Sequence, residues 1–162
     1  MRIDKLSLHK AIEEQLSNLL ANAIQAARQA YDTATHEENK AENKYDTLGL
    51  EAAYLAEGQS KRVAELENNL QEFKSLKIKD FHSDMEIGIG ALICLSDIDA
   101  EKKYVFYSHV AGGVEVHYQD IRVMLITQAS PLGKALKNSF LGDVLTINQT
   151  HNPIHYDVVG MW

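Results

Sequence analysis

Cysteine, proline and long apolar runs are scarce in this 162-residue sequence, and each scarcity excludes a class of protein. The single cysteine, Cys94, can form no disulfide within the chain. No stretch approaches the roughly 20 apolar residues that a membrane-spanning helix requires. The first residues turn polar before the apolar core of a signal peptide could form. We therefore expect a cytoplasmic protein with no membrane association.

The sequence also has fewer basic than acidic residues. The chain has 16 Lys and Arg against 23 Asp and Glu, which gives a net charge of −7. Both halves are acidic, because residues 1–80 carry 11 basic and 14 acidic groups and residues 81–162 carry 5 and 9. Broad binding to a phosphate backbone depends on clustered Lys and Arg. Any action on nucleic acid is therefore expected to be indirect, through a protein partner.

Helical spacing dominates the first half, because both prolines, Pro131 and Pro153, lie far downstream. Two apolar stripes alternate steps of three and four residues, which is the pattern of two coiled-coil helices. We expect Ser7 to cap the first helix. The first stripe consists of Ile12, Leu16, Leu19, Ala23, Ala26, Ala30 and Thr33, and the second of Gly49, Ala52, Ala56, Gln59, Val63, Leu66, Leu70 and Phe73.

The chain reverses between the stripes, where residues 35–47 have no apolar repeat. If Phe73 packs near Ile12, the numbers of paired residues add up to about 85. The reversal then falls near Glu42 and Asn43. This pairing predicts an antiparallel helical hairpin.

The hairpin, assigned to residues 1–76 with its tip at about 37–47, is long for so small a protein. A helix from Leu8 to the reversal would be on the order of 50 Å long at 1.5 Å per residue. Toward the tip, the seam changes from large apolar residues to Ala, Gly, Thr and Gln, and such small residues bury little area. We therefore predict a slender hairpin that projects from the rest of the protein and is weakly held at its far end.

The second half consists of short β-branched and aromatic segments with turn residues between them. Residues 77–85 are assigned to a linker and residues 86–162 to a compact β-rich domain. Ser130 and Pro131 open a short helix, because serine caps a helix and proline is tolerated in its first turn. The predicted strands are residues 91–95, 103–107, 114–117, 121–126, 144–147 and 154–159. The predicted fold class is α+β, a long helical hairpin followed by a small antiparallel β domain of five or six strands with one helix.

Several residues that could bind a metal or act as nucleophiles have simpler structural roles. His151 and His155 are four apart, but Pro153 between them prevents a helix from placing both on one face. No cysteine or carboxylate completes a zinc set of known spacing. Cys94 lies in an apolar run and is expected to be a small buried residue, and Ser130 has no local base to activate it. We expect no stable metal site and no cofactor of the protein's own.

The C-terminal half carries a two-part motif. Residues 130–136 read SPLGKAL, and residues 140–147 read FLGDVLTI. Together they resemble the helix–turn–strand signature S-P-x-x-x-A-L…G-x-x-x-G-D-x-V of the GreA/GreB family of bacterial transcript-cleavage factors. Ser139 and Phe140 stand where the family usually has glycine and a basic residue.

Two further stretches extend this resemblance to nearly the whole chain. Residues 87–91 (IGIGA) are similar to the family's I-G-S start of the first strand, and residues 62–67 (RVAELE) to its R-I-x-E-L-E stretch in the second hairpin helix. The resemblance implies that a C-terminal domain of FKBP-like fold docks on RNA polymerase while the hairpin enters the polymerase secondary channel. The candidate docking residues are Ser130, Pro131, Leu132 and Phe140.

The hairpin tip is where the resemblance implies chemistry. In the family, acidic tip residues help to hold a second Mg²⁺ at the polymerase's own active site, where stalled RNA is cleaved by two-metal catalysis. The factor itself then has no catalytic residues. The tip candidates in this chain are Glu37, Glu38, Glu42, Asn43 and Asp46, and Glu42 and Asp46 are the candidates to share the Mg²⁺.

The family's pair of tip acids is incomplete in this chain. The family tip reads approximately G-D-L-x-E-N-A-E-Y, and residues 42–45 (ENKY) are similar to its second half but one residue shorter. Asn39, three residues before Glu42, stands where the family has aspartate. A register counted from residues 62–67 differs by three and places Glu42 and Tyr45 at the acid positions. Neither register supplies both carboxylates.

These observations predict a monomeric transcription elongation regulator that binds RNA polymerase. Three alternatives remain open. A secondary-channel inhibitor would use the same hairpin to compete with true cleavage factors without the chemistry. A coiled-coil adaptor or self-associating protein would pair its exposed stripe with another chain, and prolyl isomerisation would follow only from the FKBP-like fold.

Overall fold

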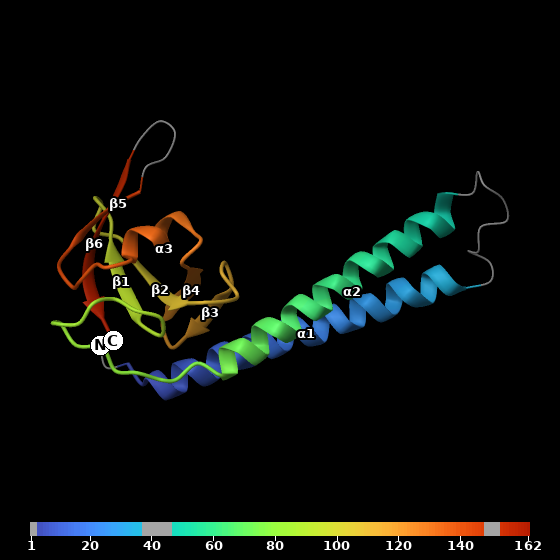
Figure 1. The fold of residues 1–162 in the computed structure, drawn as a ribbon, viewed down its shortest axis with the longest axis horizontal. Helices are drawn as coiled ribbons and strands as arrows, with labels where there is room; N and C mark the ends of the chain where they lie inside the picture. The colour runs from blue at the N-terminus through green and yellow to red at the C-terminus, as the bar shows by residue number, and fades with distance from the viewer. Residues whose placement is uncertain (1–2, 37–46, 148–152) are drawn as a thin grey trace. The chain divides into compact units, whose positions relative to one another are not determined.

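The computed structural model describes residues 3–36, 47–147 and 153–162. The chain divides into two compact units. Glu14–Gln71 form one unit, whose described residues are helical except His36. Met1–Glu13 and Glu72–Trp162 form the other, which holds the sheet (Figure 1). The predicted boundaries at residues 76, 77–85 and 86 stay predictions.

Both long helices predicted from the stripes are present. Helix α1 spans Lys5–Thr35 and helix α2 spans Thr47–Lys74. The prediction that Ser7 caps α1 is wrong, because the Asp4 carboxylate accepts hydrogen bonds from the backbone N–H groups of Leu6 and Ser7, at 3.1 and 3.3 Å. Asp4 therefore accepts hydrogen bonds from the first backbone N–H groups of α1, and the cap lies three residues earlier than predicted. No helix in the described ranges is both long and apolar enough to cross a bilayer.

Within the helical unit, α1 and α2 lie side by side with the predicted register (Figure 1). One shallow hollow between them is lined by Ala26 and Ala30 from α1 and by Leu55 and Gln59 from α2, so paired residue numbers again add up to about 85. The predicted seam positions are buried or half-buried from residue 16 to Ala30 on α1 and from residue 52 to 70 on α2. Thr33, the last predicted position of the α1 stripe, is exposed but lines the same hollow, together with Ala52 of α2.

The second unit contains one six-stranded sheet with strand order β3-β4-β2-β1-β6-β5. All six predicted strands and the short helix are present, with bounds within two residues of those predicted. The elements are β1 (Leu92–Ser96), β2 (Lys102–Ser108), β3 (Glu115–Tyr118), β4 (Ile121–Thr127), α3 (Pro131–Leu136), β5 (Val144–Ile147) and β6 (Ile154–Met161).

The sheet is mixed, which corrects the prediction of a wholly antiparallel sheet. Strands β2 and β4 pair in parallel, from Tyr104 opposite Val123 to Ser108 opposite Thr127. After β2 the chain passes to the edge of the sheet, where β3 forms an antiparallel hairpin with β4. Strand β4 then returns beside β2 in the same direction as β2. Apolar residues alternate in the same way in a parallel and in an antiparallel strand, so the sequence pattern does not reveal such a crossover.

The two faces of the sheet bury different neighbours. On one face, Leu136 of α3 packs into a core with Tyr107, Ile93 and Leu95. Phe81, within the stretch assigned to a linker, is buried in the same core. Near the other face, Phe106 of β2 contacts Phe73, with ring centroids 5.8 Å apart. The sheet is therefore packed on both sides within its own unit.

Candidate functional site

The start of α3 is fixed by a serine cap. Ser130 has extended backbone angles, its hydroxyl oxygen accepts a hydrogen bond from the Gly133 N–H at 3.0 Å, and its hydroxyl donates to the Thr127 carbonyl at 2.8 Å. Pro131 stands in the first turn. The predicted helix opening at these two residues is confirmed, and it follows from the cap and proline preferences of helix starts.

Gly133 is held against backbone that leaves no room for a side chain. A Cβ built on it would lie 1.9 Å from the Thr127 carbonyl oxygen. The Tyr107 hydroxyl donates a hydrogen bond to the Gly133 carbonyl at 3.0 Å in a buried position. Strand β4 and helix α3 thus meet at a rigid corner, and this corner sets the positions of Ser130 and Pro131.

The two residues that depart from the family signature have different surroundings. Ser139 is buried, its carbonyl accepts a hydrogen bond from the Ile87 N–H at 2.8 Å, and its hydroxyl donates to the Leu136 carbonyl at 2.6 Å. Phe140 is 41% exposed, and its N–H donates to the Asp143 carboxylate at 2.8 Å. Ser139 therefore anchors the end of α3, while Phe140 places an aromatic ring in contact with solvent.

The four docking candidates thus fall into two kinds. Pro131 and Phe140 are exposed, and Leu132 is half-buried against the core. The Ser130 hydroxyl makes two hydrogen bonds within the protein. Pro131, Leu132 and Phe140 have side-chain surface that a partner could contact. Ser130 fixes the backbone that carries Pro131 and Leu132.

The tip candidates Glu37, Glu38, Glu42, Asn43 and Asp46 lie outside the described residues. Their predicted reversal near residues 42 and 43 therefore stays a prediction. In the ranges that the structure describes, no group of three or more His, Cys, Asp or Glu side chains could hold a metal ion. The metal chemistry implied by the resemblance rests on the tip alone.

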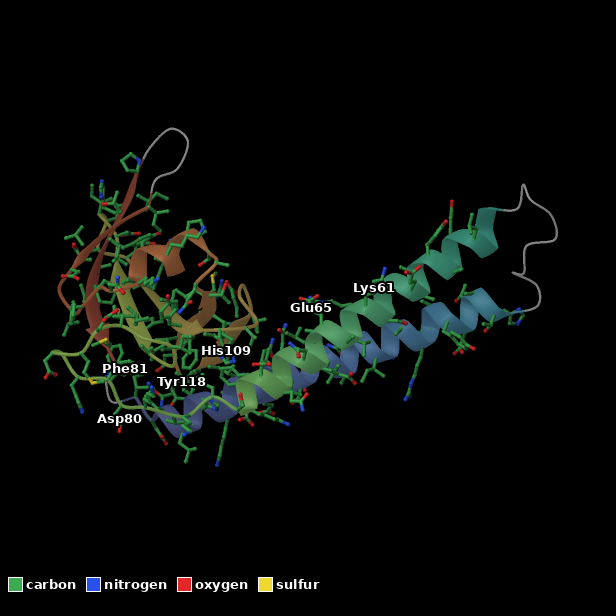
Figure 2. All side chains as sticks on the ribbon, viewed as in Figure 1. Lys61, Glu65, Asp80, Phe81, His109 and Tyr118 are labelled. Atoms are coloured by element: carbon green, nitrogen blue, oxygen red, sulfur yellow. The ribbon has the colours of Figure 1, made fainter. Side chains whose placement is uncertain are left out.

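Charged residues on α2 form local pairs along its exposed side. Lys61 pairs with Glu57 at 2.8 Å, and Arg62 pairs with Glu65 at 3.0 Å, at spacings of four and three residues. The hydrogen bond to Lys61 lowers the pKa of Glu57, and the same bond raises the pKa of Lys61. Lys61 and Glu65 both lie on α2 in the helical unit (Figure 2). Exposed pairs of this kind contribute little to stability. We therefore interpret this side of α2 as a solvent-exposed helix face.

The sequence interpretation missed a buried lysine in the sheet unit. The ammonium nitrogen of Lys5 donates hydrogen bonds to the backbone carbonyls of Lys79 (2.6 Å), Gly90 (2.6 Å) and Trp162 (3.0 Å). It also lies 4.7 Å from the centroid of the Phe81 ring. Burial lowers the pKa of Lys5 to about 8, although the Asp80 charge acts in the opposite direction. Figure 2 labels Asp80 and Phe81 in this unit. Lys5 thus joins three separate stretches of the chain.

A buried histidine was also missed. The His9 ring stacks on Phe73 with centroids 4.4 Å apart, and its Nδ1 lies 3.3 Å from the Glu13 carboxylate. Its Nε2 is buried and has no hydrogen-bond partner among the described residues. Burial is the largest influence on the pKa of His9 and lowers it. The signal was present in the sequence, because Lys5 and His9 extend the stripe of Ile12 toward the N-terminus at the same alternating steps of four and three.

Cys94 behaves as predicted. It is free and buried in β1, and burial raises the pKa of its thiol. A buried thiol with a raised pKa is a poor nucleophile. Cys94 is therefore a packing residue.

No protein-family model matches the chain. The sequence relatives of this chain include proteins named transcription elongation factor GreA. The protein from Xanthomonas axonopodis pv. citri is 30% identical over 142 residues, which cover 86% of this chain and 79% of the relative. The protein from Acetivibrio thermocellus is 26% identical over 152 residues, which cover 91% of this chain and 87% of the relative.

Solved structures give a weaker likeness. GreA factor homolog 1 (Gfh1) of Thermus thermophilus is 24% identical, covers 93% of this chain and 94% of its own, and has a TM-score of 0.39. A structure of the transcription factor Gfh1 is 27% identical, covers 94% of each chain and has a TM-score of 0.41. At TM-scores this low, neither likeness carries an argument.

Proposed function

This chain belongs to the family of transcription elongation factor GreA, and from this premise we propose that it binds RNA polymerase and regulates transcript elongation. As a member of this family, it is a regulator and not an enzyme in its own right. The observation that carries the proposal is the 30% identity with the Xanthomonas relative across 86% of this chain. We propose that one copy of the chain acts on one polymerase, in the cytoplasm.

The pair of helices is the part that we propose enters the polymerase secondary channel. Helix α1 has 31 residues, which corresponds to about 45 Å at 1.5 Å per residue. Its seam with α2 uses Ala23, Ala26 and Ala30, and small residues let two helices approach closely. A long, narrow helical pair suits a confined channel, and the segment that joins the helices carries four acidic residues: Glu37, Glu38, Glu42 and Asp46.

Docking is assigned to the sheet unit around α3. Pro131 and Phe140 are exposed, and Leu132 is half-buried beside them in the sequence. The serine cap and the close approach of Gly133 to Thr127 hold the backbone of this corner. Apolar groups on a rigid backbone lose little conformational entropy on binding, which supports their use as a docking surface.

A non-cleaving inhibitor of the secondary channel is the second candidate function. The observation that favours it is the incomplete acid pair of the tip: in one register Asn39 stands where the family has an aspartate, and in the other Tyr45 stands at an acid position. An amide is a weaker ligand for Mg²⁺ than a carboxylate, because hard cations prefer charged oxygen ligands. In the cleavage function, the carboxylates of Glu42 and Asp46 would help to hold a second Mg²⁺ at the polymerase active site, and that ion would supply two-metal chemistry.

The test is incubation of the protein with a backtracked elongation complex in the presence of Mg²⁺. We expect the wild-type protein to bind core polymerase and to change the fate of the stalled RNA. Shortening of the RNA that is lost in Glu42→Ala and Asp46→Ala supports the cleavage function. Slowed elongation without shortening supports the inhibitor. Glu67→Ala, an exposed acid on α2 outside the tip, is the matched control and should behave as wild type.

Two results would overturn parts of this proposal. Shortening that both tip variants retain would refute the assignment of Glu42 and Asp46. Stable self-association with no binding to core polymerase would refute polymerase regulation and favour the coiled-coil adaptor.

A further inference from the structure

Three backbone carbonyls of the sheet unit converge on one point. The oxygens of Lys79, Gly90 and Trp162 lie 2.6, 2.6 and 3.0 Å from the ammonium nitrogen of Lys5. The same nitrogen lies over the Phe81 ring, 4.7 Å from its centroid. Carbonyl oxygens can replace the hydration shell of a monovalent cation, as in potassium channels, and an aromatic face also attracts a cation. The three oxygens, called the carbonyl site below, therefore have the chemistry of a cation site.

Two of the three oxygens are held by other hydrogen bonds, independently of the cation. The Trp162 carbonyl also accepts a hydrogen bond from the Leu92 N–H at 3.0 Å. The Gly90 carbonyl belongs to the same peptide group as the Ala91 N–H, which donates to the Gly88 carbonyl at 3.0 Å. Gly90 has a φ of +94°, a backbone conformation that glycine adopts without strain. The surrounding backbone thus places these two oxygens of the carbonyl site.

A charge at this point is opposed by burial and by the helix dipole. Lys5 is only 9% exposed, and burial lowers its pKa to about 8. Lys5 is also the first residue of α1, where the dipole of a helix disfavours a cation. A primary ammonium has three N–H donors, and each has one carbonyl acceptor here. This complete match of donors and acceptors keeps the buried group charged at neutral pH.

The carbonyl site joins stretches that are far apart in the sequence. Lys5 begins α1, Lys79 and Gly90 precede β1, and Trp162 follows β6. A cation in the carbonyl site therefore links the first residue of α1 to the stretch before β1 and to the end of β6. Without a cation, three inward-facing carbonyls would lose their common partner, and unpaired buried carbonyls destabilise a fold.

We propose that the carbonyl site is a binding site for a primary ammonium ion, which the chain fills with its own Lys5 side chain. The number of carbonyls equals the number of N–H donors of this ion, whereas a hard metal cation such as Ca²⁺ takes about 6–8 oxygen ligands. The bound ammonium, and not the aliphatic part of Lys5, holds the three stretches together. When the Lys5 side chain is shortened, a free alkylammonium ion binds in its place. The inference does not require that the protein bind polymerase.

A free ion can reach the carbonyl site from solvent. Lys5 lines an open hollow of about 550 Å³ together with Asp4, Leu6, Ile78 and Asp80. Leu6 and Ile78 are exposed, so the hollow offers apolar surface to a short alkyl chain. Its two acidic residues raise the local concentration of cations. The hollow thus suits a small ion that has one ammonium group and one alkyl chain.

The experiment is chemical rescue of the full-length Lys5→Ala variant by n-propylammonium, which has the three carbons and the nitrogen that the substitution removes. The readout is urea unfolding followed by the fluorescence of Trp162. We expect a lower urea midpoint in Lys5→Ala and a saturable recovery with propylammonium chloride. Half-saturation should fall on the order of 10 mM, because so small a ligand binds weakly. At ten times that concentration, the folding equilibrium should shift about tenfold toward the folded state.

The controls separate charge, shape and ionic strength. Lys10→Ala removes an exposed lysine from α1, and propylammonium should change neither its midpoint nor that of the wild type relative to equal sodium chloride. 1-Propanol has a similar chain without the charge, and tetramethylammonium has the charge without N–H donors. Neither compound should rescue Lys5→Ala.

Three outcomes would overturn the inference. The first is a urea midpoint of Lys5→Ala equal to that of the wild type. The second is no saturable rescue by propylammonium. The third is equal rescue by 1-propanol or tetramethylammonium, which would show that filled volume or charge alone is sufficient. If Lys5→Ala is unfolded without the ion, the same titration is followed as recovery of the native Trp162 emission, and no recovery overturns the inference equally.

Discussion

Replacement of Gly133 by alanine should distort the connection between β4 and α3, which positions the docking candidates. The added Cβ would lie 1.9 Å from the Thr127 carbonyl oxygen and 2.7 Å from the Thr127 carbonyl carbon, whereas real Cβ atoms stay at least 3.0 Å from such neighbours. The clash is with backbone, which cannot rotate away as a side chain can. Helix α3 or strand β4 must therefore move by about 1 Å.

The expected loss of stability follows from what this shift disrupts. Overpacking of a rigid site costs about 1–3 kcal/mol. The Ser130 cap contributes about 1 kcal/mol, and the buried hydrogen bond from Tyr107 to the Gly133 carbonyl contributes about 1 kcal/mol. We expect Gly133→Ala to lower the free energy of unfolding of the sheet unit by about 3–5 kcal/mol, a large share of the roughly 5–15 kcal/mol of a typical domain.

The assay is urea unfolding followed by the fluorescence of Trp162, the single tryptophan, which lies in the sheet unit. The control is Gly58→Ala in α2, where no described atom lies within 4 Å of the added Cβ. That change should raise helix stability by about 0.5–1 kcal/mol, because alanine has less conformational freedom to lose than glycine. Equal unfolding midpoints for wild type and Gly133→Ala would refute the reasoning.

Two further predictions concern buried titrating groups. Burial lowers the pKa of His9 below its usual 6.5, so the unfolded chain binds a proton more readily and stability should fall as the pH drops below about 6.5; urea unfolding between pH 7.5 and 5 should show a flatter slope in His9→Phe. Burial also lowers the pKa of Lys5 from 10.5 to about 8. The folded protein then loses this proton at a lower pH than the unfolded chain, so the free energy of unfolding should rise between about pH 8 and 10.5. Lys5→Met should abolish this rise. If either variant keeps the pH profile of the wild type, the burial argued for that residue is wrong.

Most elements of the fold could be predicted from local patterns. The alternating steps of three and four located the contacting faces of α1 and α2, because residues at that spacing lie on one side of a helix. The register followed from pairing Phe73 with Ile12. The strands and α3 were located within two residues by β-branched runs and by the Ser130–Pro131 start. These signals are local, since each depends on a few neighbouring residues.

What escaped prediction depends on contacts between distant residues. The parallel pairing of β2 with β4 follows from where the chain crosses to the sheet edge, and no local pattern records that path. Lys5 and His9 occupy positions of the apolar stripe, but as polar residues they were not predicted to be buried. Their burial depends on distant residues: the Gly90 carbonyl accepts a hydrogen bond from Lys5, and the Phe73 ring stacks on His9.

The most direct test of polymerase regulation maps where the segment between α1 and α2 lies in a complex with RNA polymerase. An iron chelate attached at Asn43→Cys generates hydroxyl radicals that cut nearby polypeptide, and Cys94 does not interfere because it is buried. The same chelate at Ser60→Cys, on an exposed part of α2, is the positional control. The proposal predicts cuts beside the catalytic Mg²⁺ from position 43 and cuts farther away from position 60. Cuts confined to the outer surface of the polymerase from position 43 would contradict it.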